Sequence, residues 1–273
     1  MGLFQISENS KMKQAKEKIN KLFQSFLARF NIGITRFGTL RKLREIAGND
    51  IDVLMTLPQY HSSQLLQLLK KSNSQLRQDL FVLSELNFKK NGFFVEFGAT
   101  NGIDLSNTYL LEKEFGWNGI LAEPAKIWHK NLKSNRAANI ETKCVWSESH
   151  SILNFNQVDF AELSTINHFS SLDSHKEARK SGSVYEVETI SLNDLLSNFD
   201  APSKIDYLSI DTEGSEFEIL KDFHFHKYQF SVITCEHNFT PMREKIYSLL
   251  TQNGYVRKYP HLSQFDDWYI KAD

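Results

Sequence analysis

Four side chains in the last third of the sequence combine carboxylate and imidazole groups in two short clusters. Asp211 and Glu213 come after one apolar run, and Glu236 and His237 come after another. A carboxylate or a neutral imidazole can accept the proton of a hydroxyl group, which makes the hydroxyl a better nucleophile. His237 is the preferred general base because imidazole titrates near neutral pH, and Glu236 or Asp211 would orient it or the substrate.

The same residues have other interpretations. Asp211 and Glu213 could cap the helix expected from residue 216 onwards, and His237 could be a buried structural histidine. Together with Asn238, these side chains also offer oxygen and imidazole ligands to Mg²⁺ or another divalent ion. We do not favour a metal, because acids at strand ends in α/β folds usually bind the substrate or the cofactor.

A glycine-containing loop is the second feature with chemical meaning. Residues 93–102 read FFVEFGATNG, an apolar run followed by a turn that contains Gly98 and Gly102. Glycine lets the chain leave a buried strand and enter a helix without a Cβ atom that blocks a ligand. Glu96 precedes this turn, where a carboxylate would repel a pyrophosphate but attract an ammonium or sulfonium group. The loop therefore favours S-adenosylmethionine over a dinucleotide.

A second strand with an acid at its end completes a βαβ unit. Residues 118–122 are typical of a short buried strand, which Glu123 and Pro124 close. An acid about 20 residues past such a glycine turn accepts hydrogen bonds from ribose hydroxyls, although Glu123 could also cap the following helix. Residues 106–117 carry apolar side chains at helical spacing and would form the crossover helix.

The remaining sequence predicts the other strands of an α/β fold. Strands are expected at residues 141–146, 152–158, 184–190, 205–210 and 230–235, with Ser147 and its neighbours at the edge of the adenine pocket. The short segments 254–259 and 268–271 have no room for a helix between them, so they must pair antiparallel. The polar segment 170–183 could form a lid over the substrate.

The composition is typical of a folded, soluble enzyme. The 273 residues are 41% hydrophobic and carry a net charge of −1, which gives no general attraction to nucleic acid. No apolar run approaches the roughly 20 residues of a membrane span, so we expect a cytoplasmic protein. Cys144 and Cys235 are expected to be buried packing groups rather than a disulfide or a metal site.

The first part of the chain differs from the rest in charge. Residues 1–50 contain ten Lys or Arg and four Asp or Glu. Residues 11–30 are typical of a basic amphipathic helix, which could rest on an anionic membrane surface or a partner, or could pack as an accessory helix. We therefore expect a helical N-terminal extension at residues 1–71 and a catalytic domain at residues 72–273.

Several motifs, in this order, resemble the FkbM-type S-adenosylmethionine-dependent methyltransferases. They are SQLRQDL at 74–80, VEFGA at 95–99, LSNTYLLE at 105–112, AEP at 122–124, IDTEGSE at 210–216 and CEHN at 235–238. The resemblance covers residues 74–273. It implies a class I, Rossmann-like fold with a doubly wound, mostly parallel seven-stranded sheet and a C-terminal antiparallel hairpin.

The resemblance also implies an activity, which is O-methylation of a hydroxyl on a sugar, glycan or other secondary metabolite. With the loop and the strand ends, it gives the expected cofactor-binding residues: Gln78, Asp79, Glu96, Gly98, Ala99, Asn101, Gly102, Ser106, Glu123, Pro124, Ser147 and Asp211. Covalent catalysis is unnecessary, because alignment of the acceptor oxygen with the methyl group supplies most of the rate enhancement.

Two other functions remain open at this point. A metal-dependent glycosyltransferase could use Asp211 and Glu213 to hold a nucleotide-sugar diphosphate through a divalent ion, although Glu96 and the C-terminal hairpin argue against it. A non-catalytic module could bind S-adenosylmethionine without transferring its methyl group. The acids at the strand ends argue against this third hypothesis, because an idle pocket does not need them.

Overall fold

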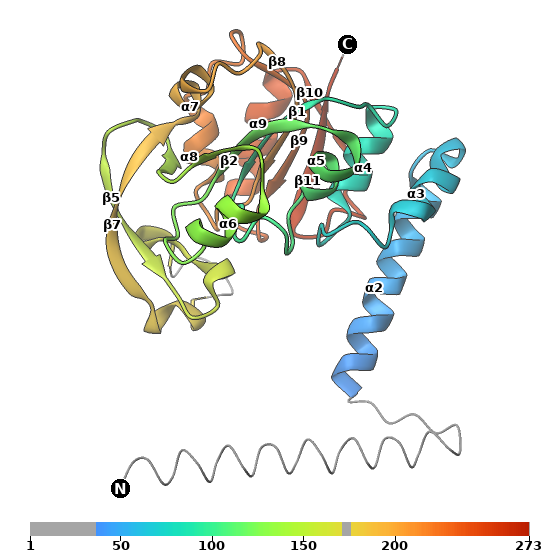
Figure 1. Ribbon diagram of the computed structural model, residues 1–273, viewed down its shortest axis with the longest axis horizontal. Coiled ribbons are helices and arrows are strands. Elements are labelled where there is room, and N and C mark those ends of the chain that lie inside the picture. The colour runs from blue at the N-terminus through green and yellow to red at the C-terminus, as the bar shows by residue number, and fades with distance from the viewer. Residues whose placement is uncertain (1–36, 171–175, 273) are drawn as a thin grey trace, which may run out of the picture. The chain divides into compact units, whose positions relative to one another are not determined.

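The computed structural model of the chain describes residues 37–170 and 176–272 (Figure 1). The chain divides between Asn49 and Asp50 into two compact units. The basic amphipathic helix expected at residues 11–30 and part of the lid expected at 170–183 lie outside the described residues. Within the described residues, no helix is long and apolar enough to cross a membrane.

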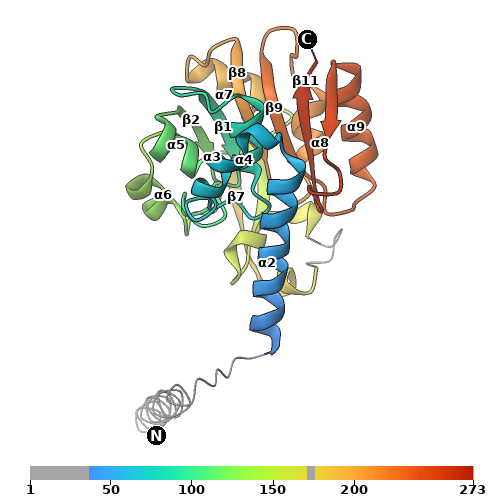
Figure 2. The same ribbon diagram turned by 90° about the vertical axis from the view of Figure 1, so that its right-hand side faces the viewer.

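The unit that begins at Asp50 is built on a seven-stranded mixed sheet with the order β10-β11-β9-β8-β1-β2-β3. Its strands are β1 (Phe93–Phe97), β2 (Asn118–Ala122), β3 (Asn139–Glu141), β8 (Lys204–Ile210), β9 (Gln229–Glu236), β10 (Tyr255–Lys258) and β11 (Asp266–Lys271). Neighbouring strands from β3 to β9 pair parallel. The strand β11 pairs antiparallel with both β9 and β10, and Figure 2 shows β9 and β11 side by side. The predicted α/β class is confirmed.

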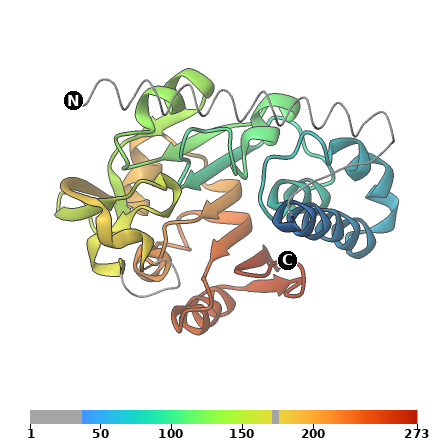
Figure 3. The same cartoon turned by 90° about the horizontal axis from the view of Figure 1, so that it is seen from below.

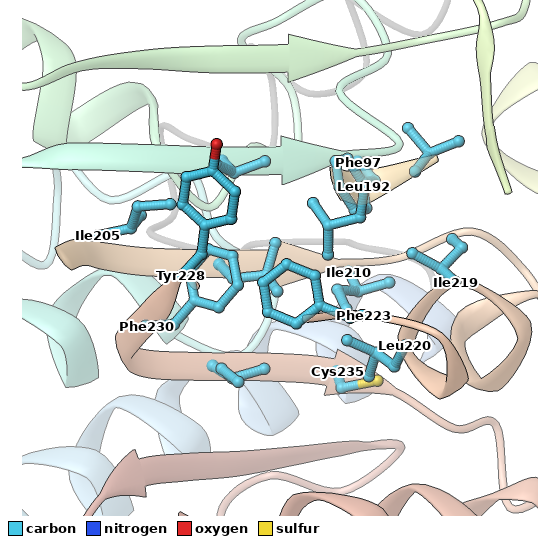
Figure 4. Close-up of a cluster of buried hydrophobic side chains, with 14 of the residues drawn as sticks. Phe97, Leu192, Ile205, Ile210, Ile219, Leu220, Phe223, Tyr228, Phe230 and Cys235 are labelled. Atoms are coloured by element: carbon cyan, nitrogen blue, oxygen red, sulfur yellow. The ribbon is translucent and has the colours of Figure 1, made fainter. Parts of the chain in front are cut away.

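Helices cover both faces of this sheet because the buried strands are apolar on both sides. On one face, Val95 and Phe97 pack in a cluster with side chains of α7 (Leu192–Asn198), α8 (Glu216–Lys221) and α9 (Met242–Gln252). Figure 4 shows part of this cluster, in which Ile219 and Leu220 lie near Ile210.

On the other face, Phe94 packs in a second cluster with α4 (Gln78–Glu85), α5 (Tyr109–Phe115) and α6 (His129–Asn135). Alternate side chains of β1 therefore point to opposite faces of the sheet, as the two-residue period of a strand requires. The helix α5 is the crossover helix that the sequence predicts between β1 and β2.

Residues 50–71 belong to the second compact unit and pack against its core. The end of α2 (Phe37–Thr56), a 3₁₀ turn η1 (Gln59–His61) and α3 (Ser62–Leu68) precede α4. Val53, Leu57 and Leu65 are buried in the same cluster as α4. The compact unit thus starts at Asp50, whereas the sequence pattern predicts a domain start at residue 72.

A second, four-stranded sheet has the order β4-β7-β5-β6. It consists of β4 (Cys144–Trp146), β5 (Ile152–Gln157), β6 (Thr165–Ile166) and β7 (Ser183–Ser191). It lies to one side of the main sheet, away from the red C-terminal strands (Figure 1 and Figure 3). The sequence predicts most of these strands but not that they form a separate sheet. Cys144 is the first residue of β4 and is buried, Cys235 lies in the main core, and both thiols are free.

Candidate active site

A cavity of about 380 Å³ lies at the carboxyl ends of the central strands. Glu96 and Gly98 line it from β1 and its following loop, Glu123 from the end of β2, Asp211 from the end of β8, and Glu236 from the end of β9. The strand order reverses between β1 and β8, and ligands of doubly wound sheets bind at such a reversal. The volume is in the range of small-molecule sites.

The turn after β1 holds the ends of three strands together. Gly98 has φ +75°, and its N–H donates to the Ala122 carbonyl at 3.1 Å. A Cβ atom at Gly98 would overlap the carbonyl oxygen of Asp211. Gly102 has φ +82°, and a Cβ atom there would lie 2.6 Å from the Cγ of Arg136. Both glycines are therefore needed for backbone geometry, but only Gly98 lines the cavity.

Glu123 is a buried carboxylate held by two backbone groups. Its Oε2 accepts a hydrogen bond from the Thr100 N–H at 2.8 Å, and its Oε1 accepts one from the Ala125 N–H at 2.7 Å. Burial raises the pKa of Glu123 to about 7. Each oxygen keeps a further lone pair, so the carboxylate can still accept hydroxyl donors from a ligand in the cavity.

Glu96 has partners that its sequence context does not reveal. Its oxygens accept hydrogen bonds from the Ser106 hydroxyl at 3.0 Å and the Asn107 N–H at 2.7 Å. The guanidinium of Arg136 is fully buried and lies 3.6 Å from Glu96 and 2.8 Å from Glu112. The charge of Glu96 is therefore compensated within the protein, and its expected attraction for a cationic ligand is correspondingly reduced.

The acids that follow β8 and end β9 come together as the sequence predicts. One oxygen each of Asp211, Glu213 and Glu236 lies within 4.8 Å of the others, and only Asp211 is exposed. Glu213 has φ +59° and accepts hydrogen bonds from Arg179 at 2.8 Å and Asn238 at 3.2 Å. The surrounding protein raises the pKa of Asp211 to about 6. Burial, followed by the charges of Asp211 and Glu213, raises the pKa of Glu236 well above its ordinary value.

The turn before α8 is held by another acid. The Oε1 of Glu216 accepts hydrogen bonds from the Thr212 N–H at 3.1 Å and the Gly214 N–H at 3.0 Å. Glu216 thus fixes the turn that precedes α8, and the N-cap residue Ser215 makes no side-chain capping hydrogen bond. The role of Glu216 there was not foreseen.

His237 does not line the cavity. Its Nδ1 accepts a hydrogen bond from the Phe239 N–H at 3.0 Å, and its buried Nε2 lies 3.8 Å from Asp267 without a hydrogen-bond partner. Burial lowers the pKa of His237. The geometry therefore favours Asp211 and Glu236, rather than His237, as the groups that meet a substrate.

The other expected site residues fall into two groups. Pro124 lines the cavity, and Gln78 lines a small recess beside it, where its amide donates to Asp266 at 2.9 Å. Asp79 accepts a hydrogen bond from the Ser72 hydroxyl at 2.7 Å, and burial raises its pKa to about 6. Like Asp79, several expected residues are not among those that line the cavity: Ala99, Asn101, Gly102, Ser106 and Ser147.

The fold and the site define an α/β protein with a small-molecule-sized cavity at the strand ends. A family model of the methyltransferase FkbM domain matches residues 96–257. The chain therefore belongs to the FkbM methyltransferase family. This assignment favours methyl transfer over the glycosyltransferase hypothesis.

Comparisons with other proteins add little to this assignment. No curated protein sequence matches the chain. A precorrin-6y C5,15-methyltransferase from Geobacter metallireducens is 12% identical, with a TM-score of 0.37, over 70% of this chain and 85% of that chain. A TehB-like SAM-dependent methyltransferase from Corynebacterium glutamicum is 8% identical, with a TM-score of 0.38, over 79% of this chain and 97% of that chain.

Proposed function

We propose that this chain is an S-adenosylmethionine-dependent O-methyltransferase whose cofactor binds in the cavity at the ends of β1 and β2. The observation that carries the proposal is the fixed orientation of the Glu123 carboxylate. Two backbone N–H groups hold its buried carboxylate in one orientation at the end of β2. A carboxylate at this position is suited to accept the two hydroxyl donors of a ribose.

The charge of the cavity supports a cationic ligand. Glu123, Asp211 and Glu236 all line it, while Arg136 compensates the charge of Glu96. An anionic pyrophosphate would be repelled by these acids, whereas the sulfonium and ammonium groups of S-adenosylmethionine would be attracted. The close approach that Gly98 permits lets the backbone of the turn contact the ligand.

The acceptor hydroxyl would meet the acids after β8 and β9. When bound, S-adenosylmethionine supplies an electrophilic methyl group on a sulfonium centre. Asp211 and Glu236 would orient the hydroxyl and remove its proton, and Arg179 would hold Glu213 beside them. His237 would act as a positioning residue, because its ring fixes the backbone of Phe239 at the cavity wall.

The rim of the cavity is suited to an acceptor with an apolar face. Phe239 is 71% exposed and Leu105 is 49% exposed, and both line the cavity. Such side chains pack against the C–H face of a sugar ring, so we propose a sugar, glycan or other secondary metabolite as acceptor. A cytoplasmic location, and a contact of the helical extension with a membrane or partner, remain proposals from the sequence.

Titration calorimetry tests the cofactor assignment. S-adenosylmethionine should bind the purified chain in the presence of EDTA, and Glu123→Ala should weaken the binding by about 1–3 kcal/mol, as expected for a hydrogen bond to a buried charge. The matched control is Glu162→Gln, which changes an exposed acid that lines the same cavity. Absence of S-adenosylmethionine binding, with metal-dependent binding of a nucleotide sugar instead, would overturn the proposal.

A transfer assay separates an enzyme from a binding module. The chain should move a labelled methyl group from S-adenosylmethionine to at least one compound in a panel of glycans and hydroxylated metabolites. Tight binding of the cofactor without transfer to any member of a broad panel would favour the non-catalytic alternative.

A further inference from the structure

The wall of the cavity is acidic and has no basic side chain among the residues that the structure describes. Seven acidic residues line it, and no Lys, Arg or His does. Arg136 lies against Glu96 and Arg179 pairs with Glu213, so each arginine offsets at most one of these charges. Five acids are left. S-adenosylmethionine carries a sulfonium, an ammonium and a carboxylate group, and its single net positive charge cannot balance them.

Two of these acids are exposed and come from separate segments of the chain. Asp104 lies in the loop after β1, and Glu162 lies in the 3₁₀ turn η2 (Ala161–Leu163). The Asp104 carboxylate accepts a hydrogen bond from the neutral amide of Asn101 at 2.7 Å. Neither acid forms an ion pair with another described residue. Even if every other acid of the cavity held a proton, these two charges would remain.

An amide in the same loop lacks a hydrogen-bond donor. Asn107 is 7% exposed, and its Oδ1 is buried with no hydrogen-bond partner among the described residues. Its Nδ2 donates to the Ser209 hydroxyl at 2.9 Å, which fixes the orientation of the amide. Asn107 lines the cavity and also the recess that Asp211 and Glu236 line. A buried acceptor without a partner is costly, so a donor group of the methyl acceptor is expected at this end of the cavity.

We propose that the methyl acceptor is an amino-substituted glycan whose protonated amines are attracted by Asp104 and Glu162 and which donates a hydrogen bond to Asn107. An ammonium group has donors and a positive charge, which suits a wall that offers carboxylate and carbonyl oxygens. The exposed ring of Phe239 favours the same ligand, because an aromatic face contacts the C–H groups of a sugar and attracts a nearby cation. This inference rests on the proposed function, since it names the acceptor of that reaction.

A protonated amine also directs the methyl group to oxygen. An ammonium nitrogen has no lone pair, so it cannot attack the methyl carbon. A neighbouring hydroxyl gives its proton to Asp211 or Glu236, and its oxygen forms a bond to the methyl carbon. The bond from that carbon to sulfur breaks, and its electron pair stays on sulfur. The expected product is a methyl ether that keeps its free amine.

Titration calorimetry with matched tetrasaccharides tests the class of acceptor. The chain, saturated with S-adenosylhomocysteine, is titrated at about pH 6, where amines are protonated. The three probes are β-1,4-linked tetramers of glucosamine and of N-acetylglucosamine, and a tetramer of galacturonic acid. The cationic glucosamine tetramer should bind about tenfold more tightly than the neutral one, and the anionic tetramer should bind most weakly. The preference should shrink at about 0.5 M salt, because salt screens exposed charges.

Variants of the two exposed acids test the source of the preference. Asp104→Asn and Glu162→Gln should each weaken binding of the glucosamine tetramer by about threefold and leave binding of the N-acetylated tetramer unchanged. The matched control is Glu186→Gln, which changes an exposed acid of β7 that does not line the cavity. None of the three variants should alter S-adenosylmethionine binding, which shows that the cavity is intact.

The outcomes separate this inference from the proposed function. Equal or tighter binding of the neutral or the anionic tetramer, or no binding of any tetramer, overturns the inference, as does a preference that both acid variants leave unchanged. Methyl transfer to neutral or anionic glycans but not to amino glycans overturns it and leaves the proposed function intact. A preference for the glucosamine tetramer that Asp104→Asn reduces, in a chain that does not bind S-adenosylmethionine, supports an amino-glycan site and contradicts the proposed function.

Discussion

Replacement of Gly98 by alanine is the sharpest test of how the turn after β1 is built. Gly98 has φ +75°, and a Cβ atom at this residue would lie well inside 3.0 Å of the Asp211 carbonyl oxygen. The obstacle is backbone rather than a flexible side chain. Either the end of β1 or the end of β8 must therefore move to make room.

The magnitude follows from two costs. An L-residue in the left-handed region costs about 1–2 kcal/mol relative to glycine. Overpacking against a fixed neighbour costs about 1–3 kcal/mol. Gly98→Ala should therefore lower the free energy of unfolding by about 2–5 kcal/mol. It should also weaken S-adenosylmethionine binding, because the displaced strand end carries Asp211.

Urea denaturation followed by tryptophan fluorescence measures the effect, since Trp117 and Trp268 are buried in the core. The control is Gly48→Ala in α2, where no atom lies within 4 Å of the added Cβ. This change should be neutral or stabilising by up to about 1 kcal/mol, because alanine favours a helix over glycine. A Gly98→Ala chain as stable as the unchanged protein would refute the described contact between the turn and β8.

Two further predictions concern buried charge. Arg136→Met should destabilise the chain by about 3–5 kcal/mol in the same denaturation assay, because it leaves Glu96 and Glu112 without their buried cationic partner; a loss below about 1 kcal/mol would contradict the ion pairs. Burial raises the pKa of Glu123 from 4.5 to about 7, so between these pH values the folded chain holds a proton that the unfolded chain has released. The contribution of Glu123 to stability is therefore greatest below about pH 4.5 and is lost as the pH rises through about 7, a change of at most about 3 kcal/mol. Glu123→Gln should remove this component from the pH dependence of unfolding, and an unchanged pH profile would show that the carboxylate titrates normally.

Local patterns in the sequence predict the framework of the site well. The apolar run before Gly98 and the strand before Glu123 form neighbouring parallel strands. Each of these predictions depends on residues that are close together in the sequence: the apolar residues of a buried strand, the length of that strand, and the glycine of the turn that follows it. The carboxyl ends of parallel strands meet at one edge, which is why Asp211 and Glu236 come together.

The partners of these acids could not be predicted in the same way. Arg136 follows Glu96 by 40 residues without any periodic relation, and the fold alone brings the two together. The same holds for Arg179 and Glu213, which are 34 residues apart in the sequence. A single arginine in a polar segment carries no local signal of burial.

The position of His237 outside the cavity lining has a simple geometric reason. Proximity to the end of a strand gives the approximate position of a residue but not the direction of its side chain. Successive side chains of an extended segment point to opposite sides. Because Glu236 faces the cavity, the adjacent His237 faces Asp267 instead. The alternation of β9 could have indicated this assignment.

A crystal structure of the chain with S-adenosylhomocysteine would test the central claim most directly. We predict density for the ligand in the cavity, with both ribose hydroxyls within hydrogen-bond distance of Glu123 and the sulfur directed toward Asp211 and Glu236. Ligand bound elsewhere, or ribose hydroxyls out of reach of Glu123, would contradict the proposed cofactor site.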